Sequence, residues 1–320
     1  MYKYIFRRIL IAIPTLIGVS ILIFFIMRIL PGDVIDAMVT DETGSLVFTE
    51  QERESIMESL GLNRPVHVQY LSWMRDVFTG DLGYSFWTKI SIGEHVRRRA
   101  PMTIEITVLS LLISWIIGLP VGILAAVYRN SIGDYIARGT VILFLAIPSF
   151  YAALGFLIFF VLVFTWRPPV EVIFFWQQPI KSLYVALPAA VAIGTGMAAV
   201  IARMARSSIL EIIREDYVRT ARSKGLGETI VLLRHAFRNA ANPVLTVIGF
   251  SIAGFISGVV ITETVFAIPG MGRLITESIA QRDFQIIQST ILVVALIYVL
   301  VNLTIDILYV FVDPRIRYDS

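Results

Sequence analysis

The sequence predicts an all-α integral membrane protein with six transmembrane helices and a small extracytoplasmic subdomain after the first helix. Of its 320 residues, 57% are hydrophobic and only 16% are charged, against about 25% charged in a soluble domain. Six uncharged runs are each long enough to cross the roughly 30 Å hydrocarbon core of a bilayer as a helix. They are Ile9–Met27, Ile106–Tyr128, Gly139–Trp166, Ser182–Ala202, Asn239–Thr262 and Phe284–Ile305.

The distribution of Lys and Arg orients these spans, because basic residues concentrate in short cytoplasmic loops. With the N-terminus inside, the inner segments 1–8, 128–138, 203–242 and 313–320 hold fifteen basic residues. The two short outer loops, at 167–181 and 264–287, hold four. The long segment 28–99 holds the other eight, but loops beyond about 60 residues are translocated largely regardless of charge. We therefore expect both termini in the cytoplasm.

The chain divides into three expected parts. Residues 1–30 form an N-terminal tail and the first span, 31–100 an extracytoplasmic segment, and 101–320 a five-helix core. In the outer segment, the stretch PVHVQYLSWMRDVF has helical apolar spacing. The stretch TGDLGYSF that follows indicates a turn and then an extended piece.

Prolines and glycines mark special positions within the spans. Three prolines inside or beside spans, Pro120, Pro148 and Pro188, are expected to kink or interrupt helices. Gly118 and Gly122 are spaced by four and therefore share one helix face, as do Gly254 and Gly258. Small residues at this spacing favour close packing between membrane helices.

The loop between the fourth and fifth spans, residues 207–242, is basic and has helical spacing. Apolar side chains over 207–222 recur on one face, so we expect one amphipathic helix there. Lys224-Gly225-Leu226-Gly227 indicates a helix end and turn. A second helix is expected from Glu228, before Asn242-Pro243 opens the fifth span. Charge and periodicity alone also fit a basic helix pair resting on anionic lipid.

Five motifs in the chain resemble one family. DYVRTARSKGL…RHAFRNAANPVLT resembles the EAA loop of ABC-transporter membrane subunits, in the version of the dipeptide/oligopeptide permease family. The stretch RRILIAIPTLIGVSILIFFIMRILPGD resembles that family's first span, and LGLNRPVHVQYLSWMRDVFTGDLGYSF resembles its outer segment. Further along, ETVFAIPGMGRLITESIAQRDFQIIQ resembles its last outer loop and DPRIRY its C-terminus. The chain departs from the general EAA pattern, because Arg219 and Thr220 stand where that pattern has Glu and its first Ala. His235-Ala236-Phe237-Arg238 also replaces a later Ile-x-Leu-Pro element.

The resemblance implies the ABC type I importer permease fold, in the prokaryotic cytoplasmic membrane. It implies a permease subunit that forms half of the translocation path and couples to a separate ATPase through a short helix in this loop. The expected partners are a second homologous permease, two ATPase subunits that bind ATP and Mg²⁺, an extracytoplasmic solute-binding protein and lipid, but no nucleic acid. The implied ATPase-coupling residues are Glu215, Tyr217, Arg219, Thr220, Ala221, Arg222, Lys224, Gly225 and Leu226.

Small peptides are the expected substrate. The same family also imports nickel complexes, glutathione and oligosaccharides, and these remain alternatives. A secondary transporter or channel would need no ATPase, and would more often show broken helices or buried charge relays. A purely structural membrane scaffold would tolerate scrambling of residues 220–226.

No motif predicts catalysis by this chain. It has no G-x-x-x-x-G-K-[ST] phosphate loop and no G-x-S-x-G element. It has no cysteine, and His67, His95 and His235 lack metal-ligand spacing. We therefore expect no enzyme activity, no metal site and no cofactor in this chain. Near the outer end of the fifth span, Glu263 fits either the outer mouth of the path or an interfacial position. The candidate pathway residues are Thr262, Glu263, Thr264, Gly270 and Gly272.

Overall fold

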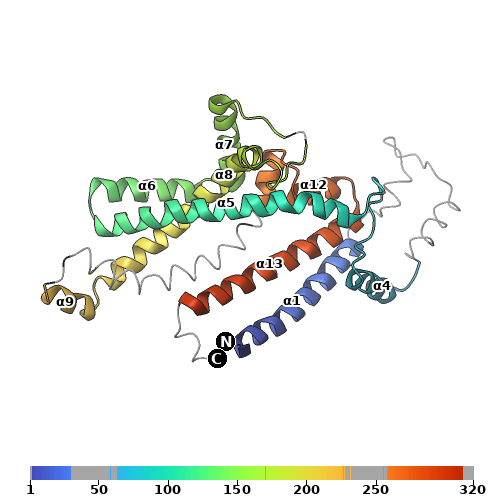
Figure 1. The fold of residues 1–320 in the computed structure, drawn as a ribbon, viewed down its shortest axis with the longest axis horizontal. Helices are drawn as coiled ribbons and strands as arrows, with labels where there is room; N and C mark the ends of the chain where they lie inside the picture. The colour runs from blue at the N-terminus through green and yellow to red at the C-terminus, as the bar shows by residue number, and fades with distance from the viewer. Residues whose placement is uncertain are drawn as a thin grey trace. The chain divides into compact units, whose positions relative to one another are not determined.

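The computed structural model describes residues 2–29, 58, 63–169, 171–225, 227, 231, 255 and 258–312, with side chains from residue 6 to residue 304. Over these residues the chain is almost entirely helical (Figure 1), which confirms the predicted all-α class. The helices are α1 (Tyr2–Ile29), α4 (Val66–Phe78), α5 (Ile92–Val127), α6 (Ile132–Ala146), α7 (Ser149–Phe164), α8 (Pro179–Ile212), α9 (Asp216–Ser223), α12 (Met271–Ala280) and α13 (Phe284–Val312). A further helical stretch covers residues 258–265.

Four helices in the described part of the chain are long and apolar enough to cross a membrane. They are α1, α5, α8 and α13, and the pair α6 and α7 makes a fifth if it counts as one span. These five correspond to the predicted first, second, fourth, sixth and third spans. The predicted fifth span, 239–262, lies mostly outside the described residues.

The third span is two helices, where the sequence suggested one uncharged run. The axes of α6 and α7 are bent by 108° at the break between them. Ile147 leaves the helix in an extended conformation (φ −80°, ψ 124°), as expected before a proline, which disfavours the helical conformation of the residue preceding it. The prediction that Pro148 interrupts a helix is thus confirmed, whereas α5 and α8 continue through Pro120 and Pro188.

The helices group into two compact units. One comprises Met1–Ala100 with Leu274–Leu303, and the other Pro101–Arg273 with Thr304–Ser320. Three helices, α5, α12 and α13, contribute residues to both units. Each unit is described by itself.

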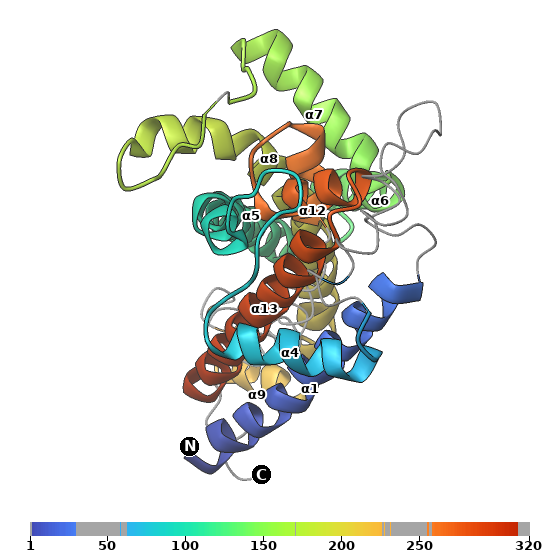
Figure 2. The same ribbon diagram turned by 90° about the vertical axis from the view of Figure 1, so that its right-hand side faces the viewer.

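In the first unit, α1 lies beside α13 (Figure 1), and α4 packs against α1 (Figure 2). Ile23 and Met27 of α1 form a buried cluster with Ile287 of α13. The hydroxyl groups of Ser20 and Tyr70 lie 2.8 Å apart and join α1 to α4. The sequence prediction of a helix over PVHVQYLSWMRDVF is confirmed by α4.

The loop between α4 and α5 is fixed by a buried carboxylate. Asp283 accepts hydrogen bonds from the Ser85 hydroxyl at 2.7 Å and from the amide of Phe86 at 3.0 Å. Gly80 and Gly83 have positive φ angles of 87° and 86°, which glycine adopts without strain. Residues 79–80 form a turn, and Tyr84 pairs with Ser91 in an isolated antiparallel bridge, so the predicted turn followed by an extended piece is present in this loop.

In the second unit, α5 and α8 approach each other closely at small residues. A Cβ added to Gly118 would lie 2.7 Å from the carbonyl oxygen of Ala198. One added to Gly122 would lie 2.6 Å from the carbonyl oxygen of Ala202. The prediction that this glycine pair serves helix packing is confirmed. The α8 helix also packs against α6 and α7.

The predicted single helix over 207–222 is wrong, because the chain breaks it into the end of α8 and a separate α9. Residues 213–215 form a turn, in which the amide of Glu215 donates to the carbonyl of Ile212 at 3.0 Å. Glu215 is itself extended (φ −67°, ψ 147°) and precedes the first residue of α9. The apolar spacing continues across this turn, so periodicity alone did not reveal the break.

Candidate functional site

The short helix α9 is the part of the chain that carries most of the predicted coupling residues. It begins directly after Glu215, whose carbonyl oxygen accepts from the amides of Val218 at 3.0 Å and Arg219 at 3.2 Å. Asp216 stands in the first turn and Arg222 in the last. These charges are favourable at the two ends of a helix dipole.

Two side chains anchor α9. Val218 is fully buried and Ala221 is 6% exposed, and both pack in one cluster with Ile212 of α8 and with Val231. The remaining residues of the helix are exposed, namely Asp216, Tyr217, Arg219, Thr220, Arg222 and Ser223. The helix is therefore fixed to the end of α8 on one side and open on the other.

The exposed side of α9 is basic and compact. The guanidinium group of Arg219 lies 3.5 Å from the carboxylate of Asp216, but both side chains are highly exposed and such a pair contributes little to stability. The hydroxyl of Thr220 donates back to the carbonyl of Asp216 at 2.8 Å, and that of Ser223 to the carbonyl of Arg219 at 3.1 Å. Short side chains held to their own helix leave room for the close approach of another surface.

Gly225 ends this segment in a left-handed conformation. Its φ angle is +76°, and its amide donates to the carbonyl of Arg222 at 2.9 Å. A Cβ at this position would meet nothing within 4 Å, so a side chain would project into open space. Lys224 beside it is exposed. The predicted helix end and turn is confirmed here, and Leu226 lies outside the described residues.

The structure describes eight of the nine predicted coupling residues, of which five lie on α9 and Glu215, Lys224 and Gly225 flank it. Buried Ala221 faces the anchoring cluster, while the others are exposed. A rigid helix with a basic, exposed face suits the docking of another protein. The second predicted helix of the loop, from Glu228, lies outside the described residues apart from Val231.

The second group of predicted residues surrounds a buried carboxylate. Glu263 is fully buried, and its carboxylate accepts hydrogen bonds from the hydroxyl of Thr103 at 2.6 Å and from the amides of Gly272 at 2.7 Å and Arg273 at 3.2 Å. These two amides belong to the first turn of α12, where a helix favours a negative charge. The carboxylate therefore holds α12 against α5.

The close packing around Glu263 leaves no room for a side chain at Gly270 or Gly272. A Cβ added to Gly270 would lie 2.1 Å from the carboxylate of Glu263, and one added to Gly272 would lie 2.5 Å from Cα of Val260. Thr262 is buried and bonds to its own helix, whereas Thr264 is exposed. The geometry shows a tightly packed node around Glu263, and a role of these five residues in the path stays a prediction.

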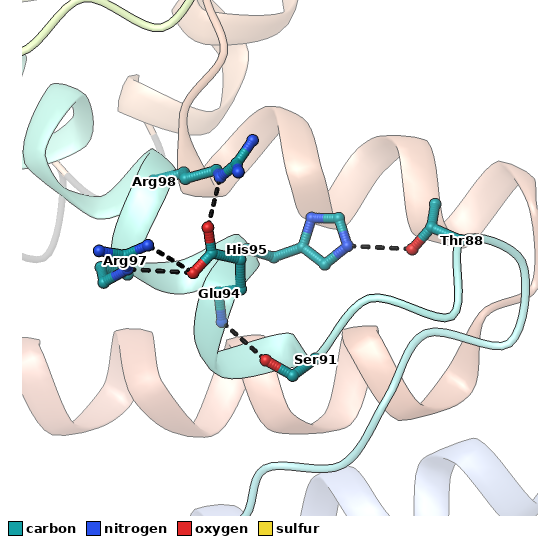
Figure 3. Close-up of polar contacts among 6 residues, drawn as sticks. All are labelled: Thr88, Ser91, Glu94, His95, Arg97 and Arg98. Carbon is teal, nitrogen blue, oxygen red and sulfur yellow. Dashed lines mark hydrogen bonds and ion pairs between the residues drawn. The ribbon is translucent and has the colours of Figure 1, made fainter.

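A third polar cluster lies on the first turns of α5 (Figure 3). Glu94 accepts from Arg97 at 2.7 Å and from Arg98 at 2.6 Å, and both arginines are largely exposed. The Nε2 atom of His95 lies 3.1 Å from the hydroxyl of Thr88. Among the residues that the structure describes, no group of three or more His, Cys, Asp and Glu side chains could hold a metal ion.

One pair was missed by the sequence reasoning. The carboxylate of Asp134, at the start of α6, lies within 2.9 Å of two guanidinium nitrogens of Arg206 on α8. The motif Ser131-x-x-Asp134 signals a helix start, so the position of Asp134 could have been inferred. Its partner could not, because the two residues are 72 positions apart in the sequence.

Two family models match the chain. Residues 118–318 match the family described as binding-protein-dependent transport system inner membrane component. Residues 1–107 match the N-terminal model of binding-protein-dependent transport system membrane components. Together they cover most of the chain, including α9 and the node around Glu263.

The chain is also similar over its whole length to named proteins. It is 39% identical to the dipeptide transport system permease protein DppB of Alkalihalophilus pseudofirmus, over 99% of this chain and 100% of that protein. It is 36% identical to DppB of Escherichia coli K12, with 99% of each chain covered. A putative peptide transport system permease protein of Brucella abortus is 37% identical, with 100% of each chain covered.

Two solved structures share the fold. A chain of the inward-facing MetNI methionine ABC transporter superposes with a TM-score of 0.54 at 17% identity, covering 68% of this chain and 96% of that one. A chain of an amino acid ABC transporter crystallised with histidines gives a TM-score of 0.50 at 17% identity, over 69% of this chain and 94% of that one. The fold is therefore shared with chains of two ABC transporters.

Proposed function

Because the chain belongs to the family of binding-protein-dependent transport system inner membrane components, we propose that it forms half of the path through which an ATP-driven importer moves small peptides. Permeases of this family are multi-pass inner-membrane subunits that work with an ATPase and a binding protein. The peptide class is supported by the names of the relatives, two of which are dipeptide transport permeases. This chain would carry no ATPase site of its own.

The proposed assembly has five protein chains. A second homologous permease completes the path, two ATPase subunits bind ATP and Mg²⁺ on the cytoplasmic side, and a solute-binding protein delivers peptide from outside. Both termini of this chain lie in the cytoplasm, in agreement with the bias of basic residues toward the predicted inner loops. The outer segment 28–99 and the loop 264–287 face the solute-binding protein and cap the path.

The observation that supports coupling is the exposed face of α9. The helix is anchored through Val218 and Ala221, and its basic residues Arg219 and Arg222 are exposed. In the proposed cycle, closure of the ATPases on ATP pushes α9, and the spans move between inward-open and outward-open states. The exposed charges orient docking more than they drive it, because surface ion pairs contribute little.

A substitution at the tip of the segment tests this proposal. Gly225→Glu adds a side chain that projects into open space and forces a residue with a Cβ into a positive φ angle. We expect co-purification of the ATPase and ATP-dependent peptide uptake each to fall at least about tenfold, the scale of losing one interface hot spot. Asn has a smaller side chain than Glu and adopts positive φ angles more readily. Gly225→Asn should therefore reduce co-purification and uptake less than Gly225→Glu.

The matched control is Gly80→Glu, which makes the same change at another glycine with positive φ and open space, in the predicted outer segment. It should leave co-purification of the ATPase unchanged. ATP-dependent uptake at the wild-type level in Gly225→Glu, with normal membrane insertion, would rule out α9 as the coupling element. Uptake that persists without any ATPase would instead favour a secondary transporter.

A further inference from the structure

The inner ends of α6 and α8 are joined by an ion pair that the coupling mechanism described above does not use. On α8, Nε of Arg206 lies 2.8 Å from Oδ1 of Asp134, and Nη2 lies 2.9 Å from Oδ2. The Asp134 side chain is fully buried and that of Arg206 is 20% exposed. A two-pronged pair of this kind fixes both the distance and the relative orientation of the two groups.

Asp134 is itself held firmly at the start of α6. Its Oδ2 atom accepts from the amide of Asn130 at 3.0 Å, and its own amide donates to the hydroxyl of Ser131 at 3.2 Å. The carboxylate also sits in the first turn of the helix, where the dipole favours a negative charge. Through the carboxylate of Asp134, Arg206 is therefore linked both to α6 and to the turn that precedes it.

A continuous path leads from α9 to Arg206. The anchoring residues of α9 pack on Ile212, the last residue of α8. Arg206 lies about 1.7 helical turns earlier on the same helix. Between them, Ile209 packs with Ala126 at the end of α5. A displacement of α9 would therefore move the end of α8 from Ile212 to Arg206, a stretch that packs against α5 through Ile209.

The contact is more specific than stability requires. Removing two charges from water is costly, and apolar side chains of similar volume often hold two helices together equally well. A buried pair instead provides a link with a defined geometry. This pair links α8 to α6, and α6 ends at the 108° bend before α7.

We propose that Asp134 and Arg206 are positioning residues that make α6 follow α8 when the ATPases push α9, so that this motion reaches the bent third span. The inference rests on the proposed function of α9. It assigns a mechanical role in transport to two residues outside the predicted coupling segment, which contact each other across α6 and α8.

The test uses the complete complex in proteoliposomes, with a labelled mixture of dipeptides. For Asp134→Asn and Arg206→Gln we expect the amount of peptide imported per ATP hydrolysed to fall about tenfold, within the usual range of coupling between sites. Co-purification of the ATPase and its basal activity should stay at the wild-type level, because α9 keeps its anchors. A purely structural role would lower folded yield and leave the ratio in the surviving complexes unchanged.

Three further variants sharpen the result. The double variant Asp134→Asn/Arg206→Gln should lose no more than either single variant, because all three remove the same link. Arg206→Lys keeps the positive charge but cannot make two parallel hydrogen bonds to the carboxylate. Its ratio of peptide imported to ATP hydrolysed should lie between those of the wild type and Arg206→Gln. Arg138→Gln is the matched control. Arg138 lies 3.7 Å from the carboxylate of Asp134, but both residues belong to α6, so this pair does not link α6 to α8. The variant should keep the wild-type ratio of peptide imported to ATP hydrolysed.

The proposal is overturned if assembled Asp134→Asn complexes import as much peptide per ATP as the wild type. It is also overturned if the losses of the two single variants multiply in the double variant. Should Asp134→Asn fail to assemble, Arg206→Lys decides: a wild-type ratio would contradict the link, and a reduced ratio would support it. These outcomes do not depend on Gly225→Glu, whose failure would count against the function of α9 instead.

Discussion

At the scale of single residues, a few positions are fixed by what stands next to them. Gly225 could be expected to take a positive φ angle from its place after a helix, and it does. Gly270 precedes α12 and Gly272 lies in its first turn, and their need for a hydrogen side chain comes from the carboxylate and backbone packed against them. The carboxylate of Glu263 accepts from amides of that first turn.

Replacing Glu263 by Gln tests the buried node. The amide group of Gln has only one oxygen for the three donors that meet the carboxylate, which are Thr103, Gly272 and Arg273. Leaving a buried donor without an acceptor costs about 1–3 kcal/mol. We expect a clear drop in the thermal unfolding midpoint of the purified protein in detergent.

Glu277→Gln is the comparison for this measurement, because Glu277 is a carboxylate with 36% of its side chain exposed, paired with Arg99. It should shift the midpoint much less. An equal midpoint for Glu263→Gln and the wild type would mean that the buried hydrogen bonds do not stabilise α12.

At the scale of elements, the pairing of α5 with α8 and the position of α9 shape the second unit. The spacing of Gly118 and Gly122 was enough to predict a packing face. It could not identify the opposing residues, because Ala198 and Ala202 belong to a helix about 80 positions later in the chain. The break before α9 was also hidden, since its apolar residues keep the spacing of α8.

The close approach of α5 and α8 makes a large side chain at Gly122 costly. In Gly122→Leu, the added Cβ would lie 2.6 Å from the carbonyl oxygen of Ala202 and 2.8 Å from Cβ of Ala205. Neither backbone nor an alanine methyl group can rotate away, so the helices must separate. Overpacking of this kind costs about 1–3 kcal/mol or more, and we expect the yield of folded, monodisperse protein to fall sharply.

Gly155→Leu on α7 is the control for the helix pair, because a Cβ there meets nothing within 4 Å. Its yield should remain near that of the wild type. Equal yields for the two leucine variants would show that α5 and α8 are not closely packed in the membrane.

At the scale of the whole molecule, the spans set which loops face the cytoplasm. The helix α5 has 36 residues and at 1.5 Å per residue is longer than the roughly 30 Å of hydrocarbon. The residues just before and just after it are therefore expected on opposite sides of the membrane. The proposed inside location of α9 depends on this arrangement.

The absence of cysteine from the chain makes this arrangement directly measurable. We expect Lys89→Cys to react with a membrane-impermeant maleimide in intact cells. Arg129→Cys should react only in inverted vesicles. Both positions are exposed on the chain, so a lack of reaction reflects the membrane. Labelling of both from one side, or of each from the side opposite to that expected, would contradict the proposed topology.

By itself, the sequence determined the helical membrane class, four described spans, the helix α4, and the basic segment that became α9. These features depend on hydrophobicity and spacing within about thirty residues, which the order of side chains records directly. Pro148 marked the break in the third span, and the tertiary structure gave its angle of 108°. Only the tertiary structure decided the contact of Glu263 with α12 and the pairing of Asp134 with Arg206. Each of these two contacts depends on which distant side chain fills the neighbouring space, and local patterning carries no record of that choice.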